Sequence, residues 1–162
     1  MSGLRRLSFL CLVLVLAPLA AGPAALAQSG LATFETDELV IETQDGARHG
    51  FEVELALDPQ QQAQGLMFRR DLASDAGMLF VYRPVRVVSM WMRNTVIPLD
   101  MIFIGEDGRI EKIVERTVPM SLKTISSDRP VRGVLELNGG TADRMRFAPG
   151  DRVLHEVFEE GS

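Results

Sequence analysis

Residues 89–104 read Ser-Met-Trp-Met-Arg-Asn-Thr-Val-Ile-Pro-Leu-Asp-Met-Ile-Phe-Ile, and this stretch decides how the rest of the chain is expected to fold. It contains the only tryptophan of the protein, Trp91, and a polar triplet at 93–95 between two apolar runs. The pattern predicts a strand over residues 85–92, a tight connection at Pro98 and a second strand over residues 99–104. Because each run contains few polar residues, we expect both strands to be covered on both faces.

The first 27 residues have the composition of a secretory signal peptide. Arg5-Arg6 precedes a mostly apolar run over residues 7–21, and the small residues of Ala25-Leu26-Ala27 form a cleavage site. Pro18 interrupts the run, which favours a cleaved signal over a membrane anchor. We therefore expect a periplasmic or secreted protein whose mature part, residues 28–162, forms one domain.

The charge of the mature chain limits the classes of partner that it is expected to bind. The full sequence has 17 basic and 22 acidic residues, and loss of Arg5 and Arg6 leaves 15 against 22. Such an acidic domain is poorly suited to nucleic acid or, after signal cleavage, to an anionic membrane. The only cysteine, Cys11, is removed with the signal, so no disulfide or thiolate metal site is expected. We expect no cofactor, and the expected partner is a small molecule or an envelope component.

The first part of the mature domain has the signals of a hairpin followed by a short helix. An apolar run at 39–41, a turn at 44–46 and alternating apolar and acidic residues at 51–57 predict two paired strands. Asp58-Pro59 is a typical helix start, and Gly65 can end the helix. The three apolar residues that follow, Leu66, Met67 and Phe68, are expected to dock the helix on the sheet.

The remainder of the chain predicts further short strands separated by turns. Arg83-Pro84 is expected to end one buried strand, and residues 117–131 form a long connection without a clear period, of a kind that often serves function. Elements are expected at residues 78–82, 85–92, 99–104, 110–114, 134–137 and 153–158 (strands) and 141–147 (a helix capped by Thr141). The sequence therefore predicts a mainly β domain, a sandwich or barrel with one or two short helices.

Several sequence blocks occur together in one order. They are Gly65-Leu66-Met67-Phe68-Arg69, Gly77-Met78-Leu79-Phe80, Trp91-Met92-Arg93-Asn94-Thr95-Val96-Ile97-Pro98-Leu99-Asp100, Val134-Leu135-Glu136-Leu137-Asn138-Gly139-Gly140 and Gly150-Asp151. The set resembles the DUF192 family, a domain of unknown function, over about residues 52–157. The resemblance implies a β-rich, sandwich-like domain and supplies no activity, substrate or cofactor. Asn138 departs from the family pattern, in which a proline is common near this position.

The usual signatures of catalysis are absent from the sequence. It contains no glycine-rich phosphate loop, nucleophile elbow, zinc-binding helix motif or calcium loop. His49 and His155 lie far apart, and two distant histidines without cysteine make a weak zinc site. The sequence therefore favours a binding or accessory module over an enzyme.

Six residues of the family-like blocks are candidates for a binding site. A structural interpretation pairs the Arg69 guanidinium with Asp100 or Glu136 and lets Asn94 fix its corner through its own backbone. A functional interpretation gathers the residues at one mouth of the domain, with the connection 117–131 as a lid. In that pocket Trp91 supplies an apolar wall and the polar side chains orient a small ligand. The candidate ligand-binding residues are Arg69, Trp91, Asn94, Thr95, Asp100 and Glu136.

Two other functions compete with the small-ligand module. In the first, Asp100 and Glu136 form the carboxylate pair of a hydrolase acting on envelope glycan, which requires both acids in one cleft. Methionine thioethers suit Cu(I), and Met90 and Met92 are expected on one side of a strand, near Met78, Met101 and Met120. Trp91 would then project to the other side, and methionine also serves as a core filler, so core packing is favoured over a copper site.

Overall fold

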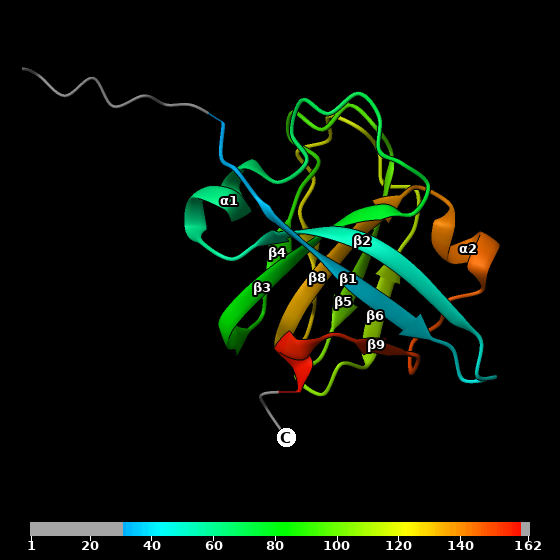
Figure 1. Cartoon of the computed structure of the whole chain (residues 1–162). Coiled ribbons are helices and arrows are strands. Elements are labelled where there is room, and N and C mark those ends of the chain that lie inside the picture. The colour runs from blue at the N-terminus through cyan, green and yellow to red at the C-terminus, as the bar shows by residue number, and fades with distance from the viewer. Residues whose placement is uncertain (1–30, 160–162) are drawn as a thin grey trace, which may run out of the picture. The chain divides into compact units, whose positions relative to one another are not determined.

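The computed structural model describes residues 31–159, so the predicted signal peptide lies outside the described residues (Figure 1). Strands dominate this part of the chain, as the sequence predicted, and two short α-helices accompany them. The elements are β1 (Glu35–Glu42), β2 (Arg48–Ala56), α1 (Pro59–Gln64), β3 (Ala76–Arg86), β4 (Ser89–Met90), β5 (Leu99–Ile104), β6 (Ile110–Val114), β7 (Ile125–Ser126), β8 (Val131–Asn138), α2 (Thr141–Met145), β9 (Arg152–Leu154) and the 3-10 turn η1 (Glu156–Phe158).

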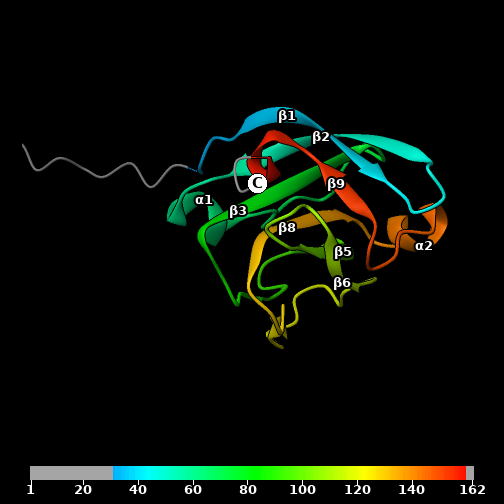
Figure 2. The ribbon, with the colours of Figure 1, turned by 90° about the horizontal axis from the view of Figure 1, so that it is seen from below.

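Seven strands form one curved sheet in the order β6-β5-β8-β3-β2-β1-β9, and Figure 2 shows the sheet curling back on itself. The two edges nearly meet, since the Ile110 N–H donates to the Asp151 carbonyl (2.9 Å) and the Val153 N–H to the Gly108 carbonyl (2.8 Å). Within residues 31–159 only β2 and β3 pair in parallel, with α1 in the connection between them. The fold is therefore a nearly closed barrel-like sheet, which leaves little free strand edge.

The sheet buries side chains on both of its faces. Alternate residues of β3 divide between two apolar cores, with Leu79 and Val81 in the barrel interior and Phe80 in an outer core. The small sheet of β4 and β7 and the segments around it cover this outer core. The same alternation in β8 sends Leu135 into the interior and Glu136 to the outer side, which places the acid in the second layer.

The hairpin and the short helix are confirmed by the structure. β1 and β2 pair antiparallel, and the Asp58 carboxylate accepts the N–H groups of Gln60 and Gln61 at the start of α1. Leu66 docks the helix and is 1% exposed. Phe68, in contrast, is 61% exposed, so its predicted docking role is wrong. The Phe68 backbone adopts φ +65°, and its N–H donates a hydrogen bond to the Asn94 carbonyl (2.9 Å). This conformation leaves the ring in solvent.

The predicted strand over residues 85–92 is wrong, although the strand at 99–104 is confirmed and fully buried. β3 continues through Arg83-Pro84 to Arg86, with a register shift against β8, and only Ser89–Met90 forms a strand afterwards. β4 pairs with two residues of β7, inside the connection expected to lack structure. Because this pair lies outside the main sheet, Val87 and Trp91 stay about half exposed.

Smaller corrections concern the last third of the chain. α2 ends at Met145 and is preceded by Gly140 at its N-cap, where Thr141 was expected to cap. The final strand ends at Leu154, and a 3-10 turn continues from there because the His155 ring nitrogen accepts the Val157 N–H. No helix within residues 31–159 is long and apolar enough to cross a membrane.

Candidate functional site

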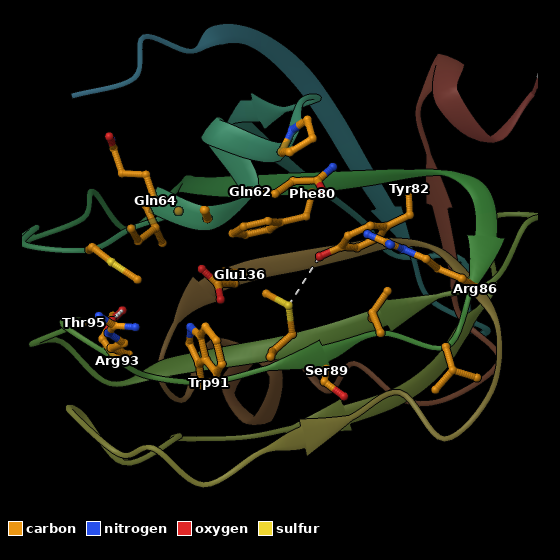
Figure 3. Close-up of a pocket in the computed structure, with 18 residues that line it drawn as sticks. Gln62, Gln64, Phe80, Tyr82, Arg86, Ser89, Trp91, Arg93, Thr95 and Glu136 are labelled. Atoms are coloured by element: carbon orange, nitrogen blue, oxygen red, sulfur yellow. Dashed lines mark hydrogen bonds between the residues drawn. The ribbon is translucent and has the colours of Figure 1, made fainter. Parts of the chain in front are cut away.

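A cavity of about 500 Å³ opens between α1 and β3 on one side and the segment around β4 on the other (Figure 3). β3 contributes Phe80 and Tyr82, β8 contributes Glu136, and the β4 segment contributes Met90 and Trp91. The volume is in the range of small-molecule sites, and the lining combines aromatic rings with a few polar groups. The cavity is therefore the candidate binding site of the domain.

Glu136 is the chemically unusual group of this cavity. The sheet register sets its carboxyl between Met78 of β3 and Met101 of β5, and the residue is only 4% exposed. No residue within 31–159 donates a hydrogen bond to the carboxyl or forms an ion pair with it. Burial raises the pKa of Glu136 to about 8, so the group is mostly protonated at pH 7.

Tyr82 closes the cavity beside Glu136. Its hydroxyl donates to the Met90 sulfur at 3.4 Å, and the Arg86 guanidinium lies 5.0 Å from the ring centre. Burial, together with the nearby Glu136 carboxyl, raises the pKa of Tyr82 to about 12, so the phenol stays neutral and can donate. Tyr82 and Glu136 are thus both neutral at pH 7 in a largely apolar surrounding, and the Tyr82 hydroxyl proton is already donated to Met90.

Trp91 forms the opposite wall. Its side chain is 51% exposed, and Figure 3 shows Glu136 lying between this indole and Phe80. The connection 117–131 holds the wall from behind, because the Met92 N–H donates to the Ser121 carbonyl (3.0 Å). No residue of that connection lines the cavity, so it is a support for the wall and the expectation of a lid is wrong.

The structure brings three of the six sequence candidates to this cavity, namely Trp91, Thr95 and Glu136. Arg69 lies elsewhere and pairs with Glu54 at 2.6 Å, so its predicted pairing with Asp100 or Glu136 is wrong.

Asn94 also stays outside the lining. Its carbonyl accepts the Phe68 N–H (2.9 Å), and its amide is 3.7 Å from the Met67 sulfur. Asn94 adopts φ +58°, which asparagine tolerates better than most residues. Its observed contacts fix the corner that leads out of the cavity wall, as the structural interpretation expected, although through the neighbouring segment more than through its own backbone.

Asp100 is completely buried, away from the cavity. Its carboxylate accepts three backbone N–H groups, those of Arg116, Gly140 and Ala142, each at 2.8 Å. Asp100 pairs with Leu137 across β5 and β8, so it points to the opposite face from Glu136. The hydrolase hypothesis required both acids in one open cleft, and the structure does not provide this arrangement.

The copper hypothesis also finds fewer donors than it needs. Two thioethers, of Met67 and Met90, line the cavity, and both already lie within hydrogen-bonding range of a donor. Met92 is 1% exposed and accepts from the Thr117 hydroxyl at 3.1 Å. Of the other expected methionines, Met78 and Met101 are core residues, and Met120 is 55% exposed and does not line the cavity. No three His, Cys, Asp or Glu side chains within the described chain could jointly hold a metal ion.

Sequence reasoning missed Tyr82, Met90 and Phe80 as cavity residues. A signal was present for two of them, since Phe80 and Tyr82 share the face of β3 on which Met78 opposes Glu136. If β3 and β8 had been paired in the correct register, the sequence would have predicted an aromatic ring of β3 beside Glu136.

The model of the DUF192 family, described as an uncharacterised group, matches residues 40–155. The chain belongs to the DUF192 family. Its fold is similar to that of a Sinorhizobium meliloti 1021 protein described as a candidate transcription regulator, at 47% identity over 79% of this chain and 99% of the other, with a TM-score of 0.77. It is also similar to a protein of unknown function from Novosphingobium aromaticivorans DSM 12444, at 42% identity over 84% and 94% of the two chains, with a TM-score of 0.73. A comparison with curated proteins found no match.

The exposure of Trp91 in this DUF192 domain leads to a stability prediction. Because half of the ring is already in solvent, Trp91→Ala is expected to lower the free energy of unfolding by only about 1 kcal/mol. Phe103→Ala, at a fully buried position, should cost about 3–5 kcal/mol. Urea unfolding followed by circular dichroism measures both. A cost for Trp91→Ala equal to that of Phe103→Ala would show that the ring is part of the core.

Proposed function

We propose that this protein is an exported binding or accessory module that takes a small molecule in the cavity of Glu136, Tyr82 and Trp91. The observation that supports it most is the Glu136 carboxyl, which is 4% exposed, faces the cavity and has no hydrogen-bond partner in residues 31–159. Ionising a carboxyl that is so little exposed and has no partner is costly, because burial disfavours its charged form. A ligand that satisfies the carboxyl would offset this cost.

Binding is favoured over hydrolysis because the cavity contains one carboxyl where glycoside hydrolysis uses two. The second acid of the hypothesis, Asp100, has its oxygens engaged by backbone N–H groups on the other face of the sheet. Export rests on the signal-like sequence at residues 1–27.

One relative is described as a candidate transcription regulator, but the charge of this chain argues against nucleic acid as its partner. The formal charge of this protein is −5, and nucleic-acid affinity depends on basic groups that neutralise phosphates. A small molecule or an envelope component therefore remains the proposed partner.

Trp91 offers a direct test, because it is the only tryptophan and it lines the cavity. We expect a ligand among envelope sugars, peptidoglycan fragments, amines, nucleotides and metal ions including Cu(I) to change its fluorescence and raise the melting temperature. At a hundred times its dissociation constant a ligand adds about 2.7 kcal/mol, which shifts the melting temperature by several degrees.

Two variants make the test specific. Glu136→Gln should weaken the response, and Glu52→Gln, at an exposed position of the same sheet, should leave it unchanged. Equal responses in both variants, or no response to any compound, would contradict binding at this cavity and favour a purely structural role for its lining.

A further inference from the structure

The electrostatic surroundings of Glu136 lack a positive charge close to the carboxyl. Burial is the one cause that raises its pKa, and no basic group offsets it. The Arg69 guanidinium, on the same side of the sheet, is already paired with Glu54 at 2.6 Å. The ionised form of Glu136 is therefore without a counter-ion in the described structure.

The other charged and titratable groups at the cavity lie at its ends. Arg86 stacks on the Tyr82 ring at 5.0 Å and acts on the Tyr82 phenol, whereas Arg93 lines the cavity near Thr95. In Figure 3 the two arginines lie on opposite sides of Glu136. The centre of the cavity thus holds a carboxyl, and its basic groups are peripheral.

Aromatic rings surround this carboxyl. Figure 3 shows Phe80 and Trp91 on either side of Glu136, and Tyr82, whose hydroxyl lies 3.4 Å from the Met90 sulfur, lines the same cavity. Aromatic faces attract cations through their quadrupoles, most strongly when water is excluded, and such cages recognise ammonium groups. A half-exposed indole beside a buried carboxyl is suited to a ligand that is positively charged and apolar at once.

We infer that the cavity binds an organic ammonium ion, with the Glu136 carboxylate as counter-ion and the rings of Trp91 and Tyr82 as walls. This inference rests on the proposed function and specifies the ligand class of the same site. The cation replaces the missing counter-ion, and its alkyl groups contact the rings and the Met90 thioether. Arg93, at the edge, is placed to meet a polar or anionic tail of the same ligand.

The inference determines the sign of the pH dependence. An ammonium ion requires the ionised carboxyl, and Glu136 is largely protonated below its pKa of about 8. The affinity of the cavity for the ammonium ion should therefore rise about tenfold from pH 6 to pH 7. An anionic ligand that accepts a hydrogen bond from the protonated carboxyl would show no such rise, and its affinity would fall above pH 8.

Three probes of similar size and different charge test this. Tetramethylammonium is permanently charged, tert-butanol is neutral and pivalate is anionic between pH 6 and 7. Titrating each probe in the millimolar range and following Trp91 fluorescence therefore shows how binding depends on ligand charge. We expect tetramethylammonium alone to quench the fluorescence, with an affinity about tenfold higher at pH 7 than at pH 6. That affinity should be at least tenfold lower in Glu136→Gln and unchanged in Glu52→Gln. Calorimetry with Trp91→Ala should show weakened binding of the same probe, and circular dichroism confirms folding of each variant.

The outcomes separate the two proposals. Glu136-dependent binding of pivalate or tert-butanol, or an affinity for tetramethylammonium that does not depend on pH, would overturn the ammonium inference and leave a small-molecule site. Fluorescence that responds to none of the three probes, and to no compound of the wider panel, would overturn the proposed function together with the inference.

Discussion

Asp100→Ala is expected to lower the free energy of unfolding by about 4 kcal/mol, because the change removes a buried carboxylate and leaves three N–H groups, two of them buried, without an acceptor. Those groups belong to Arg116, after β6, and to Gly140 and Ala142, at the start of α2. The carboxylate therefore joins two segments that are distant in sequence. Urea unfolding followed by circular dichroism and Trp91 fluorescence measures the loss.

Asp143 provides a matched control, because it links the same two segments through an ion pair with Arg116 at 2.9 Å. Both side chains of that pair are more than half exposed, so Asp143→Ala should change the free energy of unfolding little. Asp100→Asn should fall between the two, since one oxygen keeps its acceptor role while the amide NH₂ opposes the Ala142 N–H. Equal losses for Asp100→Ala and Asp143→Ala would contradict the structural role of Asp100.

Local signals in the sequence predicted the elements whose contacts are local. Alternating residues in β2 and the Asp58 cap of α1 depend on neighbours a few positions away, and both are confirmed. The strand predicted over residues 85–92 is wrong because an apolar run suits a central strand and a segment that covers a sheet from outside equally well. Its partner is the two-residue β7 from a distant connection, which no local period indicates.

The candidate site shows the same limit at the level of a single residue. Asp100 and Glu136 are each a lone acid in an apolar strand, and the sequence treats them alike. The register of β5 against β8 pairs Asp100 with Leu137 and Met101 with Glu136, which sends the two carboxyls to opposite faces. Backbone N–H groups bind the carboxylate on the face of Asp100, whereas the face of Glu136 opens to a cavity. An acidic residue therefore has a structural role at position 100 and has no protein partner at position 136 within the described residues.

Glu136 is expected to make the protein less stable as the pH rises, which is the opposite of the usual behaviour of a paired carboxylate. Its pKa is raised from an ordinary 4.5 to about 8 in the folded state, so the folded protein holds a proton that the unfolded chain releases. The stabilising contribution is complete below about pH 4.5 and is lost as the pH rises through 8. The loss is about 1.4 kcal/mol per pH unit, on the order of 5 kcal/mol over the whole window.

The difference between wild type and Glu136→Gln isolates this effect, because glutamine has a similar volume and does not titrate. Urea unfolding at intervals from pH 5 to 9 should give similar stabilities at pH 5 and an increasing advantage for Glu136→Gln above it, levelling off near pH 8. Glu52→Gln, at an exposed position, should follow the wild type throughout. A constant difference between wild type and Glu136→Gln across this range would mean that the carboxyl is ionised in the folded protein, with water or another group stabilising its charge. If a saturating ammonium ion abolishes the difference at pH 8, the same carboxyl is both the source of the instability and the binding group, because a bound cation lowers the pKa that burial raised.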